Sequence, residues 1–191
     1  HWVAVKKVLR YLKRTRDFML TYRRAEDLQL VRFSESDFAG CQDNRKSTSG
    51  YVFMMADRAV SWKSAKQALI ASSTMQAEFV ACYGAATQAV WFKNFMMTFV
   101  VVDFVSRSIQ LYCDNSSAVL FINNNKSITG SKHIEIKYLT IKKKVKNGDV
   151  IAKHISTDDM VADLLTKCLS PCIFERHVAS MGLVASWDAF I

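Results

Sequence analysis

Residues 109–123 read Ile-Gln-Leu-Tyr-Cys-Asp-Asn-Ser-Ser-Ala-Val-Leu-Phe-Ile-Asn, an apolar run that is followed by a carboxylate and then by a second apolar segment. The run Ile109–Cys113 predicts a short buried strand, and residues 115–123 predict a helix. Asp114 lies between them, and the carboxyl end of a strand is a favoured position for a site in α/β sheets. Asp114 could instead cap the helix, so both interpretations stay open.

Two other acidic settings could turn a carboxylate toward such a site. Glu35 and Asp37 follow the apolar run 28–33, and residues two apart on a strand share one face. Glu78 lies near the start of a long helix predicted over about 75–97, where the helix dipole favours a carboxylate. The alternative for each is a simpler role, namely solubilising a strand end or stabilising a helix terminus.

The fourth acidic setting is Asp163, which lies in an apolar helical stretch nine residues after His154. One loop and half a helix could bring Asp163 and His154 to the same site, where a histidine near a metal-bound phosphate could transfer protons. A lone histidine is otherwise a structural or surface residue. Gathered carboxylates repel each other, and divalent cations such as Mg²⁺ or Mn²⁺ offset that repulsion. Together with a net charge of +9, such a site indicates phosphodiester cleavage.

The remaining pattern predicts an α/β fold. Strands come first and then alternate with helices, which favours a mixed sheet with helices on both faces. The elements expected are helix 1–14, extended segments 17–23 and 28–38, a polar loop 43–50, paired strands 51–55 and 59–62, a helix capped within 72–74, a basic helix 131–146, strand 150–155, and a helix that Thr157 or Asp158 caps and that runs through Lys167.

Composition bounds the class of protein. The 191 residues suit one domain, or one domain and part of a neighbour, and the excess of 26 Lys and Arg over 17 Asp and Glu favours a polyanionic partner, unless the chain is merely a basic soluble protein. The apolar stretch 85–105 carries polar and charged residues, which argues against a membrane span. Five irregularly spaced cysteines suggest reduced thiols, and Cys168, Cys172 and His177 lack the second close pair of a zinc site.

Seven motifs follow one another along the chain: Tyr11–Thr15; a strand and loop formed by Phe33–Gly40 and Arg45–Gly50; Ser61–Gln67; Ser72–Phe79; Tyr112–Ala118; Ser131–Lys137; and Val161–Lys167. In this order they resemble the ribonuclease H domain of the copia-type LTR retrotransposon Pol polyprotein, beginning with the tail of its reverse transcriptase. A chain that starts without Met, within a helical pattern, also suggests a piece of a larger polyprotein.

The resemblance implies a ribonuclease H-like fold, with a mixed five-stranded sheet flanked by helices. It also implies hydrolysis of the RNA strand of RNA–DNA hybrids by two ions of Mg²⁺ or Mn²⁺ during reverse transcription. The catalytic and metal-binding candidates are Glu35, Asp37, Glu78, Asp114 and Asp163, and His154 corresponds to the mobile histidine that some ribonucleases H use. The domains expected are 1–24, the end of the reverse transcriptase; 25–169, the ribonuclease H domain; and 170–191, a helical tail.

The first acid departs from the family pattern. The family normally has two aspartates in this strand, and the earlier one is expected to be the ligand, whereas here Glu35 holds that position and Asp37 keeps the later one. The extra methylene moves the carboxylate by about an ångström, which metal sites tolerate poorly. An alternative is therefore an impaired remnant that keeps the fold and nucleic-acid binding, or one stable only beside its reverse transcriptase. Glycines expected at Arg32 and at 57–58 are also lost.

A set of basic residues could contact the phosphates of the hybrid. The candidates are Arg45, Lys46, Lys63, Lys66, Lys132 and Lys137, and further lysines follow on the same helix. A solvated helix face is the simpler interpretation of the lysine cluster. The partners expected are therefore an RNA–DNA hybrid and an upstream reverse transcriptase, with no membrane. The location expected is intracellular, in a cytoplasmic virus-like particle or the nucleus.

Overall fold

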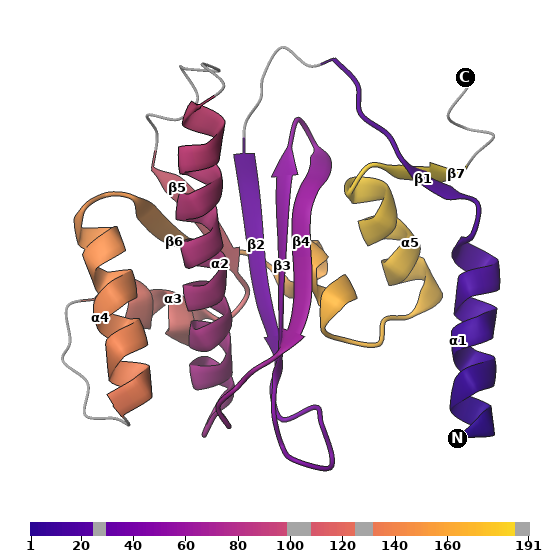
Figure 1. Ribbon diagram of the computed structural model, residues 1–191, viewed down its shortest axis with the longest axis horizontal. Coiled ribbons are helices and arrows are strands. Elements are labelled where there is room, and N and C mark those ends of the chain that lie inside the picture. The colour runs from indigo at the N-terminus through magenta and orange to yellow at the C-terminus, as the bar shows by residue number, and fades with distance from the viewer. Residues whose placement is uncertain (25–29, 99–107, 125–131, 186–191) are drawn as a thin grey trace.

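The structure is a computed structural model that describes residues 1–24, 30–98, 108–124 and 132–185. Its centre is a five-stranded sheet in which β2, β3 and β4 form an antiparallel meander, and β5 and β6 run parallel to β2 (Figure 1). The predicted mixed five-stranded sheet is therefore confirmed. In sheet order the strands are β4 (Arg58–Lys66), β3 (Thr48–Met55), β2 (Leu30–Asp37), β5 (Ile109–Cys113) and β6 (Val150–His154).

Three helices cover one face of the sheet: α2 (Thr74–Met97), α3 (Ser116–Asn123) and α4 (Lys132–Lys146). The main core forms where their apolar sides meet the strands, and it includes Phe53 of β3 and Phe79 of α2, both essentially inaccessible to solvent. The cap predicted within 72–74 is confirmed, because the Ser73 side chain accepts a hydrogen bond from the Gln76 amide.

On the opposite face the 3₁₀ helix η3 (Val161–Leu165) packs on β2 and β3. Another 3₁₀ helix, η2 (Thr157–Asp159), precedes it, and α5 (Pro171–Ser180) follows. A second, smaller core lies between this layer and the sheet, so β2 and β3 are covered on both sides. The single helix predicted from residue 157 or 158 to 167 is wrong: Met160 separates two 3₁₀ turns, and the Ser156 side chain caps the first.

The two ends of the described chain meet beside this layer. Strands β1 (Phe18–Leu20) and β7 (Leu183–Ala185) form an antiparallel pair, so the segment predicted as a helical tail also contains a strand. Helix α1 (Trp2–Thr15) has no buried residue and packs against α5 through an Arg14–Glu175 ion pair and a ring contact between Tyr11 and Phe174 (Figure 1). The division into three domains stays a prediction.

Two local differences concern the hairpin region. The polar loop predicted over 43–50 is shorter, because β3 already begins at Thr48. Ala56 and Asp57 both have positive φ, 52° and 57°, in the turn between β3 and β4. Glycine adopts this conformation without strain, whereas other residues do not. The structure thus places positive φ at Asp57, one of the two positions where a glycine was expected, and at Ala56 before it.

Several other features complete the fold. All five cysteines are free thiols. No helix in the described ranges is both long enough and apolar enough to span a membrane. Residues 28–29, 99–105 and 131, which belong to three of the predicted segments, lie outside the residues that the structure describes.

Candidate active site

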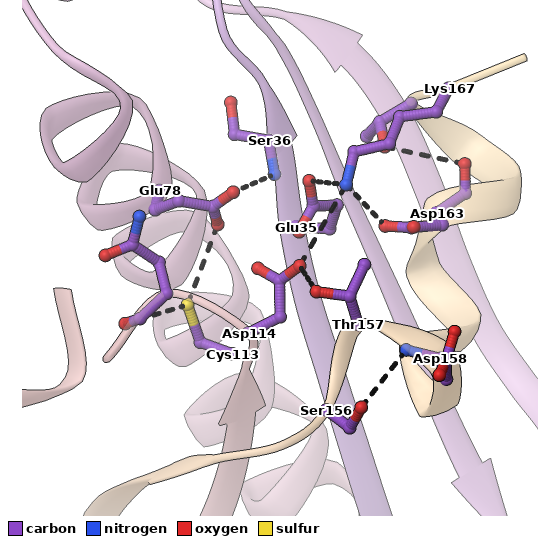
Figure 2. Close-up of polar contacts among 12 residues, drawn as sticks. Glu35, Ser36, Glu78, Cys113, Asp114, Ser156, Thr157, Asp158, Asp163 and Lys167 are labelled. Atoms are coloured by element: carbon purple, nitrogen blue, oxygen red, sulfur yellow. Dashed lines mark hydrogen bonds and ion pairs between the residues drawn. The ribbon is translucent and has the colours of Figure 1, made fainter. Parts of the chain in front are cut away.

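Parallel pairing of β2 with β5 brings the carboxyl ends of these strands to the same edge of the sheet. Glu35 comes from β2, and Asp114 directly follows β5. The first turns of α2 carry Glu78 to this edge, and η3 carries Asp163 from the other face (Figure 2). Four of the five acids predicted from the sequence are thus brought together from four separate elements.

Asp114 is available to the site because its neighbour caps the helix. The Asn115 side chain accepts a hydrogen bond from the Ala118 amide at 2.9 Å, so the interpretation of Asp114 as the cap of α3 is wrong. The Thr157 hydroxyl instead donates to Asp114 Oδ2 at 2.9 Å. His154, at the end of β6, places its Nε2 3.0 Å from the Asp114 carbonyl oxygen, so the histidine lies beside the acids.

Glu78 is buried and held from two sides. Its Oε1 accepts a hydrogen bond from the Ser36 amide at 3.1 Å, and its Oε2 lies 3.6 Å from the Cys113 sulfur. Burial raises the pKa of Glu78 to about 11, with further contributions from Cys113 and from the carboxylate of Glu35. Such a carboxyl group ionises at neutral pH only when a cation compensates its charge.

Glu35 is 1% exposed and lies at the centre of the group. Its Oε1 forms an ion pair of 2.8 Å with Lys167 Nζ, whereas its Oε2 is buried without a hydrogen-bond partner in the part of the chain that the structure describes. Burial raises the pKa of Glu35 to about 8, and Lys167 opposes that shift. The unsatisfied oxygen is a position where a cation would find a ligand.

Lys167 is a site residue that the sequence analysis missed. Its Nζ lies 3.0 Å from Asp163 Oδ1 and 4.0 Å from Asp114 Oδ2, in addition to its contact with Glu35 (Figure 2). Burial lowers the pKa of Lys167, but its partners Glu35 and Asp163 outweigh burial, so the pKa is raised and the ammonium is charged. Burial likewise raises the pKa of Asp163 against the effect of Lys167. Lys167 follows Asp163 by four residues, and this spacing, which lets side chains meet in a helix, was the signal in the sequence that could have indicated their contact.

Asp37 lies apart from the other acids. It is the last residue of β2, and its carboxylate lies against Gly40, where an added Cβ would collide with it. It lines the same pocket of about 520 Å³ as Glu35, Glu78 and Asp114. The two acids thus face the same pocket, as expected for residues two apart on a strand, but of the two only Glu35 belongs to a group of described residues whose ligand atoms lie within 4.8 Å of one another. Which of the two is a metal ligand stays a prediction.

The acids form two groups that could hold a metal ion. One contains Glu78, Cys113 and Asp114, and the other contains Glu35, Asp114 and Asp163; in each, the ligand atoms lie within 4.8 Å of one another. Asp114 belongs to both. Predominantly carboxylate ligands and the unpartnered Glu35 oxygen suit hard divalent cations. Within the described residues neither group includes the cysteines and histidine of the rejected zinc interpretation, Cys168, Cys172 and His177.

A buried glutamine, also missed from the sequence, braces this edge. The Gln67 side-chain nitrogen lies 3.0 Å from the Ser36 hydroxyl, 2.8 Å from the Ser49 hydroxyl and 2.9 Å from the Ala77 carbonyl oxygen. It therefore links β2, β3 and the start of α2. These are the elements that carry Glu35 and Glu78, so Gln67 helps to fix their relative positions.

The basic candidates differ in their exposure. Arg45 and Lys63 are exposed, Lys46 is half-buried, and the exposed Lys66 lies 3.0 Å from the sulfur of Cys41. Lys137 is half-buried on α4, with its Nζ 5.4 Å from the centre of the Tyr83 ring. The side chain of Lys132 lies outside the described part of the structure. Binding of nucleic acid by these residues stays a prediction.

Comparison with solved structures identifies the fold. The chain aligns with LC11-RNase H1 in complex with an RNA/DNA hybrid at a TM-score of 0.53 and 15% identity, over 72% of this chain and 94% of that chain. It also aligns with the foamy viral protease-reverse transcriptase in complex with an RNA/DNA hybrid at a TM-score of 0.51 and 17% identity, over 78% of this chain and 21% of that chain. The molecule has the ribonuclease H-like fold predicted from the sequence.

Comparison of sequences identifies the relatives. The chain is 34% identical to the retrovirus-related Pol polyprotein from transposon TNT 1-94 of Nicotiana tabacum and 32% identical to that from transposon RE2 of Arabidopsis thaliana, each over 96% of this chain. It spans only 14% and 12% of the length of these curated relatives. No protein-family model matches it. The chain is homologous to retrovirus-related Pol polyproteins of plant transposons, and the predicted copia-type resemblance is confirmed.

Proposed function

We propose that this chain hydrolyses the RNA strand of RNA–DNA hybrids during retrotransposon reverse transcription. The observation that carries the proposal is the convergence of Glu35, Glu78, Asp114 and Asp163 at one edge of a ribonuclease H-like sheet. Homology to Pol polyproteins and the likeness to structures solved with RNA/DNA hybrids support the same substrate.

The four acids would hold two divalent cations, Mg²⁺ or Mn²⁺, with Asp114 shared between the two groups. Bound there, the ions would supply an activated water and stabilise the negative charge that develops on the phosphate. Glu78 and Glu35 are suited to this role because their burial disfavours an ionised carboxylate without a compensating cation.

Other residues of the chain orient these groups. The Ser36 amide fixes the Glu78 carboxylate, and the Thr157 hydroxyl fixes that of Asp114. We assign proton transfer or product release to His154, whose imidazole is exposed beside Asp114. Hydrogen bonds that are already formed before the substrate binds lower the reorganisation that the reaction requires.

The hybrid would be held by its phosphates. Arg45, Lys46, Lys63 and Lys66 lie on the loop before β3 and on β4, and Lys132 and Lys137 belong to α4. Contacts of this kind give affinity that is independent of sequence and decreases with salt. In the same proposal the segment 1–24 continues from a reverse transcriptase, 25–169 is the nuclease and 170–191 is a tail, and the polyprotein acts in a virus-like particle or the nucleus.

The second candidate function is hybrid binding without efficient cleavage. It is favoured by Glu35, whose longer side chain reaches the Lys167 ammonium at 2.8 Å where the family pattern has an aspartate. In this case the fold and the basic surface would remain functional, while the first metal position would be impaired.

Cleavage of a labelled RNA–DNA hybrid in Mg²⁺ or Mn²⁺ tests both candidates, with the unmodified chain, Glu35→Asp and Asp114→Asn compared side by side. Cleavage that Asp114→Asn abolishes supports the nuclease. If the unmodified chain does not cleave the hybrid and Glu35→Asp does, the result supports the impaired nuclease. If none of the three chains cleaves the hybrid but all still bind it, the nuclease would be ruled out and the binding function would remain.

A further inference from the structure

The chain places a cation of its own among the acids that would bind a metal. Lys167 Nζ contacts Glu35 at 2.8 Å and Asp163 at 3.0 Å and lies 4.0 Å from Asp114, and these three acids make up one of the two metal-binding groups. The other group, formed by Glu78, Cys113 and Asp114, shares only Asp114 with this set. The two groups are therefore not equivalent.

The fold determines the position of this ammonium. Lys167 follows η3, and its backbone amide donates to the Asp163 carbonyl oxygen at 2.9 Å. The Ser64 hydroxyl of β4 donates to the Leu165 carbonyl oxygen at 2.7 Å, which ties η3 to the sheet. Gly50 of β3 has no side chain at the point where η3 packs on the sheet. A lysine anchored in this way differs from a surface lysine that samples many positions.

The charges in this group explain why a cation is required there. Three carboxylates lie within 4.8 Å of one another, and Glu35 and Asp163 are almost inaccessible to solvent. One ammonium compensates part of this charge and stabilises the group when no metal is bound. A divalent ion placed among the same three oxygens would meet the ammonium at short range, and like charges repel strongly where water is excluded.

We propose that Lys167 is a built-in competitor for the metal position formed by Glu35, Asp114 and Asp163. Metal ions bind first at the group that contains Glu78, and occupation of the second position requires the ammonium to move out. The side chain is about one-third exposed, at 35%, so it can move toward solvent without crossing the core. This inference rests on the proposed metal-dependent function and adds to it an order of metal binding.

The direct test is titration of the chain with Mn²⁺ by calorimetry, without nucleic acid, for the unmodified chain and Lys167→Met. Methionine keeps much of the side-chain volume and removes the charge. We expect Lys167→Met to tighten the weaker Mn²⁺ site by about tenfold or more, since one charge at ion-pair distance shifts a protonation equilibrium by about ten- to a thousandfold. Lys143→Met, at an exposed lysine near the end of α4, is the matched control and should bind as the unmodified chain does.

The outcomes separate this inference from the proposed function. Equal affinities in the unmodified chain and Lys167→Met would overturn the competition and leave the metal site intact. Absence of Mn²⁺ binding in every variant, even with hybrid present, would overturn the proposed function and the inference together. Lys167→Arg provides a charge-retaining comparison, and it should keep the weaker site weak.

A second measurement needs no variant and therefore does not depend on the folding of Lys167→Met. Acylation of lysines by an amine-reactive ester, followed by mass spectrometry, reports how accessible each ammonium is. Saturation with Mg²⁺ should increase the labelling of Lys167 several-fold and leave that of Lys143 unchanged. Labelling of Lys167 that is the same or lower with Mg²⁺ would contradict displacement.

Discussion

Gly50 offers a quantitative test of how the site is assembled. An alanine Cβ at this position would lie 2.8 Å from Thr166 Cγ2, 2.9 Å from Leu165 Cβ and 3.2 Å from the Ala162 carbonyl oxygen. The first two distances are shorter than carbon atoms tolerate, and the Cβ of Leu165 cannot rotate away. Gly50→Ala must therefore push η3, which carries Asp163, away from the sheet.

The magnitude follows from two opposing effects. Overpacking of a tight contact costs about 1–3 kcal/mol, whereas alanine is favoured over glycine within a strand by about 0.5–1 kcal/mol. At mid-range values the net loss should be about 1 kcal/mol, which for a chain of this size lowers the Tm by about 2–4 °C. Hybrid cleavage should also decrease, because Asp163 moves with η3.

Thermal unfolding followed by circular dichroism measures this loss. The matched control is Gly84→Ala in α2, where an added Cβ meets nothing within 4 Å. This control should gain about 0.5–1 kcal/mol, because glycine disfavours a helix interior. The two substitutions are thus expected to have opposite signs. If Gly50→Ala is as stable as the unmodified chain, η3 does not pack on the sheet as described.

Three further predictions concern charge. The folded-state pKa of Glu35 is raised from 4.5 to about 8 and that of Glu78 to about 11, so the stability that their protonation contributes is complete below pH 4.5 and decreases as pH rises. Between pH 7 and 8, above the range in which a lowered His177 pKa acts, the metal-free free energy of unfolding should fall by roughly 1 kcal/mol per pH unit for Glu78 and by somewhat less for Glu35, which loses part of its proton over the same range. Urea titrations that show no fall, or the same fall with Mg²⁺ present, would count against these shifts. Glu35→Asp should increase hybrid cleavage, because the shorter side chain withdraws from the Lys167 ammonium. Asp37→Asn should stay within about twofold of the unmodified rate, whereas loss of a transition-state interaction lowers the rate by about tenfold per 1.4 kcal/mol. The reverse pattern in single-turnover assays would assign the ligand role to Asp37. Lys63→Ala should weaken hybrid binding at every sequence and reduce the slope of log affinity against log salt concentration by about one. Fluorescence anisotropy at several salt concentrations measures this slope. An unchanged slope would show that Lys63 does not contact the hybrid.

Elements defined by local sequence were predictable. The strand at 109–113 and the helix after it follow from an apolar run and a polar break, and the structure has both. The cap of α2 at Ser73 follows from its hydroxyl. Gly148 follows the end of α4 with a φ of 74°, the left-handed conformation that glycine commonly adopts just after a helix. In each case the residues that decide the structure are neighbours along the chain.

Features that depend on distant contacts were not predictable in the same way. The segment around Asp163 has helical spacing, but it forms short 3₁₀ turns, and η3 packs on the sheet at Gly50, which is remote in sequence. The role of Lys167 depends on Glu35, which is remote in sequence. Asp37 shares a strand face with Glu35 by periodicity, yet it ends the strand, and its carboxylate lies against Gly40.

The most direct test of the account uses a hybrid in which the RNA and DNA strands carry different labels, incubated with the unmodified chain and Mn²⁺. We expect cuts in the RNA strand alone, with 3′-hydroxyl ends, that disappear with a chelator and with Asp114→Asn, because Asp114 belongs to both metal-binding groups. Cuts in both strands, or RNA cuts that survive Asp114→Asn, would contradict it.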